Sequence, residues 1–326
     1  MAYSVIDLHA DTPDVALARY RDQSNTLQKS HGHIDLPRLR QGGSLLQAMA
    51  IFAPAQPMEY MPREATPAWI FDRVYTAYQA ALKEYADEVR PVYAYEDIRR
   101  NQAAGKLSFL LTLEDGAVVD GKMEKLDELA EKGVRVITLT WNYENCFGSP
   151  NSAAPEKMTR GLTAFGKEAV QYMQERNVIV DVSHLSDGGF WDVAQLCKKP
   201  FVATHSNCRA LCGHRRNLTD EMLRTLADHG GVAGINFCAP FLAEGANFAR
   251  TEDMVRHMQH MKNVAGIETI ALGSDFDGID NEIEFGDCAG LPQLFQACEK
   301  VFTPRELDLI THENALRVLR DCMPRD

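Results

Sequence analysis

Histidine and carboxylate side chains recur in this chain at the ends of short apolar runs. The residues concerned are His9, Asp11, Glu114, His184, His205 and Asp275. His9 and Asp11 are two residues apart, and because side chains alternate along a strand, both project from the same face. Nitrogen and oxygen ligands without thiolates suit Zn²⁺, or Mn²⁺ or Co²⁺ in its place. We therefore expect this set of residues to bind metal.

A single His-x-Asp pair has an ordinary alternative, which is a hydrogen-bonded histidine beside a capping aspartate. The other apolar runs change that balance, because five of the eight runs end in a ligand-type side chain. Burying such groups without partners costs several kcal/mol each, so they must pair with one another or bind a metal ion. We favour a metal site over a purely structural polar cluster.

The elements that must position these residues are eight apolar, β-branched runs that alternate with amphipathic stretches. The runs are Val5–His9, Leu45–Phe52, Leu107–Glu114, Val134–Thr140, Val178–His184, Phe201–His205, Val232–Phe237 and Thr269–Asp275. This alternation is typical of parallel β/α units, and eight units close a (β/α)8 TIM barrel. A barrel gathers the carboxyl ends of its strands at one mouth, where active sites lie.

We expect a single barrel domain over residues 1–326, because no linker divides the chain. The stretch Ala53–Tyr95 is too long for a minimal unit and contains a helical pattern over Pro67–Ala86, so we interpret it as a helical insertion. The tail from Pro304 predicts one or two further helices, with this proline in the first turn after Thr303.

The composition is that of an ordinary globular protein. Of 326 residues, 45% are hydrophobic and 25% are charged, which excludes disordered, collagenous and disulfide-framework proteins. The net charge of −12 argues against a nucleic-acid partner. No signal-peptide pattern opens the chain, and no apolar run approaches the roughly 18 residues of a membrane span. We therefore expect a cytoplasmic protein without a membrane partner, whose eight cysteines are free thiols.

An ordered series of motifs relates the chain to one known family. The motifs are His9-Ala10-Asp11-Thr12-Pro13, Ile34-Asp35-Leu36-Pro37-Arg38, Gly42-Gly43, Leu113-Glu114-Asp115-Gly116, Asp181-Val182-Ser183-His184, Thr204-His205-Ser206-Asn207, Arg215-Arg216-Asn217 and Gly273-Ser274-Asp275-Phe276-Asp277-Gly278. Together they resemble the membrane dipeptidase (renal dipeptidase) family of amidohydrolase-like barrels, in its bacterial-type cytoplasmic form. The series covers most of the chain and is far more specific than any one motif.

The resemblance implies a zinc dipeptidase with two Zn²⁺ ions per chain. Glu114 resembles the carboxylate that bridges both ions. His9 and Asp11 would complete one ion's ligands, and His184 and His205 the other's. The implied substrate is a small dipeptide, with L-Xaa-D-Xaa pairs as one candidate class. Family members are often dimeric, so we expect a homodimer.

Two further residues receive roles from the resemblance. Asp275 resembles the family's acid/base residue, and Arg216 resembles its anchor for the substrate carboxylate. Without the family pattern, Arg216 would be interpreted as a surface arginine paired with Asp220 or Glu221.

Two positions depart from the pattern of the mammalian members. Trp141 stands where those members have a histidine that helps to bind the tetrahedral intermediate, and an indole cannot replace a charged imidazole. Asn142 or Asn145 would then assist instead. Phe241 stands where those members have a substrate-binding tyrosine, which removes one hydroxyl. Both changes affect the substrate range rather than the metal ligands.

Other functions on the same barrel remain alternatives. A lactonase, a phosphotriesterase-like hydrolase or a deaminase would use the same fold, but many such barrels bridge their metals with a carbamylated lysine, and no lysine ends a predicted strand here. A non-catalytic binding barrel would be expected to lack at least one ligand, and none is missing.

Histidines and an aspartate outside the ligand set receive structural interpretations. On helical patterns lie His229, His257, His260 and His312, which we expect to be exposed. Asp277 fits equally well as a loop cap or as a carboxylate that supports the ligands.

Overall fold

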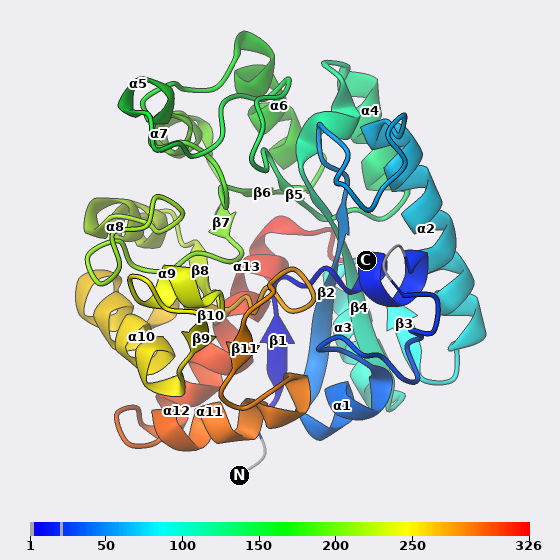
Figure 1. The fold of residues 1–326 in the computed structure, drawn as a ribbon, viewed down its shortest axis with the longest axis vertical. Coiled ribbons are helices and arrows are strands. Elements are labelled where there is room, and N and C mark those ends of the chain that lie inside the picture. The colour runs from blue at the N-terminus through cyan, green and yellow to red at the C-terminus, as the bar shows by residue number, and fades with distance from the viewer. Residues whose placement is uncertain (1–2, 20–21) are drawn as a thin grey trace.

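Parallel strands form the centre of the fold in the computed structural model, which describes residues 3–19 and 22–326. The strands of the main sheet are β1 (Val5–Asp7), β2 (Ser44–Phe52), β3 (Val89–Pro91), β4 (Leu107–Glu114), β5 (Val136–Thr138), β6 (Ile179–Asp181), β7 (Val202–Ala203), β8 (Val232–Ile235) and β10 (Ile270–Leu272). They lie in the order β2-β1-β10-β8-β7-β6-β5-β4-β3, and an additional pairing of β2 with β4 closes the ring. The predicted (β/α)8 barrel is therefore confirmed (Figure 1).

The ninth strand of the described sheet, β3, lies outside this ring. One edge of β4 pairs with β2, and its other edge is shared by two strands. Strand β3 pairs with Leu107–Phe109 at the start of β4, and β5 pairs with Thr112–Glu114 at its end. Strand β3 is an element that the sequence pattern did not predict. It lies within the stretch 53–95, after the helix that the sequence did predict.

Helices surround the strands, as Figure 1 shows. They are α1 (Leu36–Gln41), α2 (Pro67–Glu84), α3 (Tyr95–Ala103), α4 (Met123–Glu131), α5 (Pro155–Met158), α6 (Ala164–Glu175), α7 (Asp187–Leu196), α8 (Asp220–Asp228), α9 (Ala239–Leu242), α10 (Thr251–Ala265), α11 (Leu291–Cys298), α12 (Pro304–Asp308) and α13 (Asn314–Cys322). A π-helical segment, Leu309–Glu313, joins α12 to α13. A small parallel sheet of β9 (Phe248–Ala249) and β11 (Glu282–Ile283) adds a connection outside the barrel.

Local sequence explains where several helices begin. Threonine or serine hydroxyls accept a hydrogen bond from a backbone N–H of the first turn, which satisfies a group that has no partner within the helix. These caps are Thr66, Thr163, Ser186, Thr219 and Thr303, at the starts of α2, α6, α7, α8 and α12. Pro304 occupies the first turn of α12, as expected.

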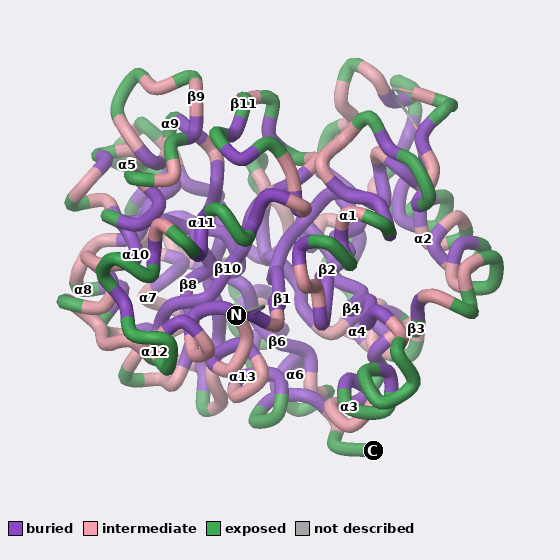
Figure 2. Tube along the Cα trace, turned by 90° about the horizontal axis from the view of Figure 1, so that it is seen from below, coloured by how far each residue is buried: buried purple, intermediate pink, exposed green. Residues whose placement is uncertain are grey.

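Apolar residues fill the interior of the barrel toward its amino-terminal end. Each strand of the ring contributes at least one buried residue to this set, and these include Ile6, Leu46, Leu110, Val136, Ile179, Val202, Val232 and Ala271. Val318 and Leu319 of α13 pack against this set, so the last helix closes this end. Figure 2 shows the resulting pattern, with buried residues along the strands and exposed residues on the outer helices and turns. The polar mouth lies at the opposite end.

The eight cysteines, all within the described residues, are free thiols as expected. Burial raises the pKa of Cys197 and of Cys322 to about 12, so both are uncharged near neutral pH.

Candidate metal centre

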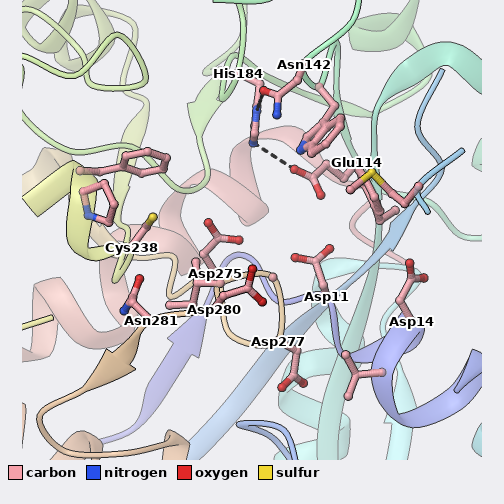
Figure 3. Close-up of a pocket in the computed structure, with 18 of the residues that line it drawn as sticks. Asp11, Asp14, Glu114, Asn142, His184, Cys238, Asp275, Asp277, Asp280 and Asn281 are labelled. Carbon is pink, nitrogen blue, oxygen red and sulfur yellow. Dashed lines mark hydrogen bonds and ion pairs between the residues drawn. The ribbon is translucent and has the colours of Figure 1, made fainter. Parts of the chain in front are cut away.

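A cavity of about 610 Å³ opens at the carboxyl end of the strands. The candidate residues in its wall include Asp11, Glu114, His184 and Asp275. Figure 3 shows the carboxylates of Asp11, Asp275 and Glu114 turned toward one shared space. Residues from β4 and from the turns after β1, β6 and β10 therefore meet at the mouth that the barrel prediction indicated.

Most of the candidate ligands lie just beyond the strands rather than in them. Strand β1 ends at Asp7, β6 at Asp181, β7 at Ala203 and β10 at Leu272, so the strands are shorter at their carboxyl ends than the apolar runs predicted. The backbone has left-handed φ values of 66° at His184 and 63° at Asp275. Such values are uncommon for residues other than glycine and are often found at functional sites.

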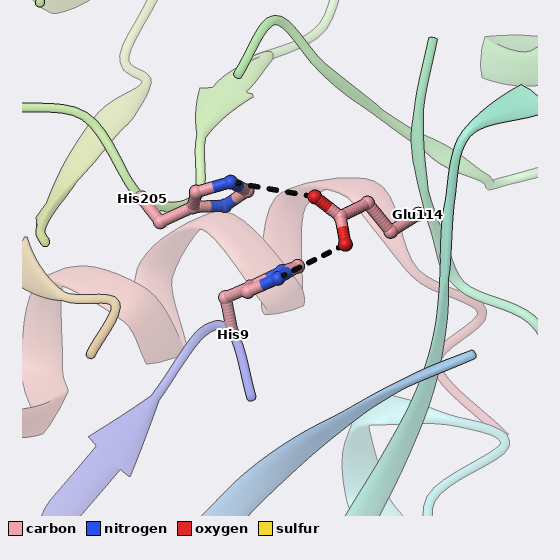
Figure 4. Close-up of side chains that lie close together, drawn as sticks. All are labelled: His9, Glu114 and His205. Carbon is pink, nitrogen blue, oxygen red and sulfur yellow. Dashed lines mark ion pairs between the residues drawn. The ribbon is translucent and has the colours of Figure 1, made fainter. Parts of the chain in front are cut away.

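Glu114, the last residue of β4, has its two carboxylate oxygens directed at different histidines. Its Oε2 lies 3.7 Å from His9 Nε2. Its Oε1 lies 3.1 Å from His184 Nε2 and 3.7 Å from His205 Nε2. Figure 4 shows His9 and His205 at opposite oxygens of this carboxylate. The carboxylate therefore stands between two groups of candidate ligands.

His9 also faces two other carboxylates. Its Nε2 lies 3.6 Å from Asp11 Oδ2 and 3.9 Å from Asp275 Oδ1. Two ligand sets emerge, each with its donor atoms within 4.8 Å of one another: His9, Glu114 and His205 in one, and His9, Asp11 and Asp275 in the other. Gly278 makes room for this approach, because a Cβ there would overlap Asp11 Oδ2 and lie 2.6 Å from Asp275 Oδ1.

These spacings fit metal coordination. Two donors bound at about 2.1 Å to a tetrahedral ion are ~3.4 Å apart, and the observed donor separations of 3.1–3.9 Å bracket that value. In addition, His9 Nε2, Asp11 Oδ1 and His205 Nε2 are buried and have no hydrogen-bond partner among the described residues. Buried polar atoms without partners are costly unless an ion binds them. The residues therefore fit a metal centre.

The electrostatics of the cluster also favour a cation. Burial alone would lower the pKa of His9, but Glu114, Asp11 and Asp275 outweigh it and raise that pKa to about 10. Burial raises the pKa of Glu114 well above its usual range, and repulsion from Asp11 adds to this. These shifts show a concentration of negative charge that a bound cation would neutralise.

The two histidines on the other side of Glu114, His184 and His205, have lowered pKa values, in contrast to His9. Burial, followed by the charge of Arg216, lowers the pKa of His184 well below its usual value. The pKa of His205 is likewise lowered, by burial and then by His9 and Arg216. Both imidazoles are therefore neutral near pH 7, and a neutral imidazole has the free lone pair that metal ligation requires.

Two candidate residues on the loop after β5, Trp141 and Asn142, line the same cavity. Trp141 packs edge-on against Phe52, with ring centres 4.8 Å apart. Asn142 Oδ1 lies 3.2 Å from His184 Nδ1 and accepts a hydrogen bond when that nitrogen carries the proton. Asn145 donates instead to Asp115, at 2.7 Å, which anchors the loop rather than the cavity wall.

Arg216 is buried, with 5% of its surface exposed. It donates to the His205 carbonyl at 3.2 Å and to Ser206 Oγ at 3.4 Å. The surface alternative is therefore wrong, because Asp220 instead pairs with His260 at 2.7 Å. Within residues 3–19 and 22–326, the Nε of Arg216 has no hydrogen-bond partner.

Phe241 lines the cavity beside this arginine. Its ring centre lies 5.4 Å from the Arg216 guanidinium carbon and 4.5 Å from the His214 ring centre. The guanidinium is therefore covered on one side by an apolar ring at the edge of the cavity.

Sequence reasoning missed Asn236, which follows β8. Its Nδ2 donates to Asp275 Oδ2 at 2.9 Å, so one oxygen of that carboxylate is fixed. The predicted run Val232–Phe237 extended past Asn236, whereas β8 ends at Ile235, so the polar residue that marks the strand end was overlooked within the run. Two buried aspartates that end strands, Asp7 and Asp181, were also given no role.

His257 was expected at the surface and is in fact buried, with 1% exposure. It faces inward because both ring nitrogens find backbone partners: Nδ1 accepts from the Cys208 N–H at 3.0 Å, and Nε2 lies 2.9 Å from the Leu242 carbonyl. This one side chain therefore joins α10 to the segments after β7 and around α9.

Asp277 fixes a loop. It accepts a hydrogen bond from Thr12 Oγ1 at 2.7 Å and from the His33 N–H at 2.5 Å. Of the two interpretations of Asp277, the loop cap describes these contacts.

Comparisons with known proteins find a matching family and similar relatives. A family model described as membrane dipeptidase (peptidase family M19) matches residues 1–323. An uncharacterized protein from the pqqA 5′ region of Klebsiella pneumoniae is 38% identical over 243 residues, covering 72% of this chain and 90% of that protein. An uncharacterized dipeptidase of Schizosaccharomyces pombe is 30% identical over 293 residues, covering 84% and 69%.

A solved structure is similar over nearly the whole chain. It is a metallo peptidase from Rhodobacter sphaeroides, liganded with a phosphinate mimic of the dipeptide L-Ala-D-Ala. It matches with a TM-score of 0.88 and 25% identity, covering 99% of this chain and all of that one. Separately, no helix in residues 3–19 and 22–326 combines the length and apolar character needed to cross a membrane.

Proposed function

This chain belongs to the membrane dipeptidase family, peptidase family M19, and on that premise we propose that it hydrolyses dipeptides at a centre of two Zn²⁺ ions. The observation that carries the proposal is the orientation of Glu114, whose two oxygens face different histidines. A carboxylate in this position is suited to bridge two ions. Mn²⁺ or Co²⁺ would serve as substitutes.

The proposed ligand assignment follows the two sides of Glu114. His9 and Asp11 would hold one ion, and His184 and His205 the other. When bound, a pair of such ions lowers the pKa of a shared water, polarises the scissile carbonyl and stabilises the oxyanion. The lack of hydrogen-bond partners at His9 Nε2 and His205 Nε2 among the described residues supports this assignment.

Asp275 is the proposed acid/base residue. Asn236 holds its Oδ2, and its Oδ1 lies on the side of His9, toward the reacting atoms. The carboxylate would take a proton from the attacking water and give it to the amine nitrogen as the C–N bond breaks. Burial, which is the largest cause, raises the pKa of Asp275, so its affinity for that proton is increased.

Arg216 is the proposed anchor for the substrate's terminal carboxylate. A guanidinium can hold a carboxylate through two parallel hydrogen bonds, which fixes the distance from the carboxylate to the scissile bond. Only one residue would then fit beyond that bond, so dipeptides would be cleaved and tripeptides would not. Because the Phe241 ring covers part of the guanidinium, we expect the ring to turn as the carboxylate binds.

The amino-terminal residue of the substrate would lie on the opposite side of the metal ligands. Phe52, Met58 and Trp141 line the cavity there and offer an apolar surface, with Asn142 as a polar group beside them. The proposed stereochemical class is L-Xaa-D-Xaa, and its support is the ligand of the Rhodobacter sphaeroides relative, a mimic of L-Ala-D-Ala. Cytoplasmic location and a homodimeric state stay predictions from the sequence.

Metal analysis combined with a substrate panel tests the proposed function. The panel contains L-Xaa-L-Xaa and L-Xaa-D-Xaa dipeptides, their C-terminal amides, the matching tripeptides and a lactone. Two metal ions per chain and cleavage restricted to free-acid dipeptides are expected. A single ion per chain, or equal cleavage of amides and tripeptides, would contradict the proposal. Preference for the L,L compounds would contradict only the stereochemical part.

A further inference from the structure

We propose that Asp181 and Thr204 are positioning residues that hold His205 in the tautomer able to bind a metal ion. The inference rests on the proposed function in one respect, namely that His205 is a metal ligand. It adds two residues to which the family resemblance and the ligand pattern assign no role.

Asp181, the last residue of β6, is fully buried and accepts four hydrogen bonds. Its Oδ1 accepts from the backbone N–H groups of Ser183 and Thr204, both at 2.9 Å. Its Oδ2 accepts from the hydroxyls of Thr138 at 2.6 Å and Thr204 at 2.5 Å. In all four contacts the neighbour is the donor and the carboxylate oxygen accepts.

The Thr204 hydroxyl is directed at Asp181, although its oxygen also makes a longer contact of 3.4 Å with Ser183 Oγ, in which either oxygen could donate. A threonine hydroxyl carries a single proton, and the 2.5 Å contact with Asp181 Oδ2 needs that proton, because two bare oxygens at this distance repel. The oxygen of Thr204 also lies 2.8 Å from His205 Nδ1. With its proton committed to Asp181, it can only accept there, so His205 Nδ1 must be the protonated ring nitrogen.

The consequence appears at the other nitrogen of the ring. A neutral imidazole has one N–H, so His205 Nε2 presents its lone pair. That atom is buried, has no hydrogen-bond partner in the described part of the chain, and lies 3.7 Å from Glu114 Oε1. A lone pair that faces a carboxylate oxygen is unfavourable unless a cation stands between them. The hydrogen-bond relay from Asp181 through Thr204 to His205 thus orients the lone pair of His205 for a metal ion before the ion binds.

The opposite side of the barrel contains a similar construction with a different outcome. Asp7 ends β1 and accepts from the Ser274 N–H at 2.9 Å and from the Ser274 hydroxyl at 2.6 Å. That hydroxyl also lies 3.2 Å from the His9 carbonyl and accepts a hydrogen bond from the Phe276 N–H at 3.1 Å. Among the described residues, its other contacts are therefore with main chain and not with the His9 ring. At Asp7 and Ser274 the hydrogen bonds therefore fix the main chain, whereas at Asp181 and Thr204 they extend to the imidazole ring of His205. Of these two constructions, the one at Asp181 and Thr204 reaches the ring of a candidate ligand.

Three variants of the full chain test the inference. Thr204→Val removes the hydroxyl and keeps the shape, and Thr204→Ser keeps the hydroxyl. Thr138→Val is the matched control, because Thr138 donates to the same Asp181 oxygen as Thr204. Within the described residues, the Thr138 hydroxyl bonds to Asp181 and makes no hydrogen bond to His205. Zn²⁺ affinity is measured by competition with a chromophoric chelator, and thermal unfolding of the metal-free proteins checks that all of them fold.

We expect Thr204→Val to lower the binding affinity for one of the two Zn²⁺ ions by about 10–100-fold, which is the usual effect of losing a group that orients a ligand. Thr204→Ser should restore parental affinity, and Thr138→Val should keep it. Unchanged Zn²⁺ affinity in Thr204→Val, or an equal loss in Thr138→Val, would overturn the inference while the parent still binds two ions. Failure of the parent to bind zinc would overturn the proposed function and this inference together.

A spectroscopic measurement keeps the test valid if Thr204→Val does not fold. In the parent protein labelled with ¹⁵N-histidine and freed of metal, nitrogen shifts identify the protonated ring nitrogen, with His205→Gln used to assign the signal. A proton on Nδ1 is expected. A proton on Nε2 would overturn the inference.

Discussion

The two ends of the barrel are formed by the same strands but contain opposite kinds of residue. At the amino-terminal end, every strand of the ring contributes an apolar side chain, and α13 closes the interior. At the carboxyl end, carboxylates and imidazoles are buried within 4.8 Å of one another. The first arrangement gains free energy from burial, and the second loses it unless partners or ions compensate. Stability and chemistry should therefore respond to different mutations.

Glu114→Gln should have the largest effect, and it should abolish catalysis without lowering the stability of the fold. The amide removes the charge that both proposed ions share, so metal content should fall. Activity should fall with it, by several kcal/mol in transition-state stabilisation, on the order of 10⁴-fold in kcat/KM. Metal analysis and kinetics on the same preparation measure both.

The stability of the metal-free Glu114→Gln protein serves as the control. Burial and Asp11 raise the pKa of this carboxyl, so it is an unfavourable charge in the folded chain. Its removal should not lower the unfolding temperature of the metal-free protein. Two tightly bound ions with near-normal turnover would refute the bridging role.

Asp275→Asn should reduce turnover by roughly 10²–10⁴-fold, the scale of a lost general acid/base. The metal content should stay near two ions per chain. Asp275 Oδ1 lies close enough to His9 Nε2, at 3.9 Å, for a ligand role to be the competing interpretation. Metal analysis of the variant separates the two, because loss of an ion would make Asp275 a ligand.

Leu319→Ala should give the opposite result at the other end. Leu319 is 1% exposed and packs into the barrel interior. A cavity there should lower the free energy of unfolding by about 2–5 kcal/mol. Urea unfolding measures this change, and kcat per folded chain should stay close to parental. A large loss of kcat in folded Leu319→Ala would show that the two ends are not separable.

Arg216→Lys should have a smaller and more selective effect. Lysine keeps the charge but cannot form the paired hydrogen bonds, so cleavage of free-acid dipeptides should weaken by about 1.5–3 kcal/mol in transition-state binding. Cleavage of the amidated dipeptide should hardly change. Equal losses on both substrates would mean that Arg216 does not bind the carboxylate.

The fold was largely predictable because each strand is a continuous apolar run. The run Leu107–Glu114 matches β4 at both ends. Runs such as Val178–His184 were too long, since β6 includes only Ile179–Asp181. Pairing stops where the strands separate at the mouth, and single-sequence patterns do not contain that information. Strand β3 was missed because its three residues are too short to show a pattern.

The candidate site was predictable as residue types but not as contacts. The rule that polar residues follow apolar runs, together with the family motifs, named every residue of the two candidate ligand sets, but it gave Asp275 the role of acid/base residue rather than ligand. That rule could not predict which side chains contact one another. Thr204 and Asp181 are 23 residues apart, and their contact depends on the register of β6 and β7. The burial of His257 was likewise hidden, since its partners are backbone atoms of distant segments.

The burial of His257 makes the fold acid-sensitive. Burial lowers the pKa of its imidazole, and the ring accepts a hydrogen bond through a nitrogen that protonation would block. Below about pH 6.5 the unfolded chain takes up a proton that the folded chain refuses. This contribution to stability is therefore complete above that pH and is lost progressively as the pH falls below it. Urea unfolding at pH 7.5 and pH 5.5, compared between the parent and His257→Gln, would isolate this proton uptake on unfolding.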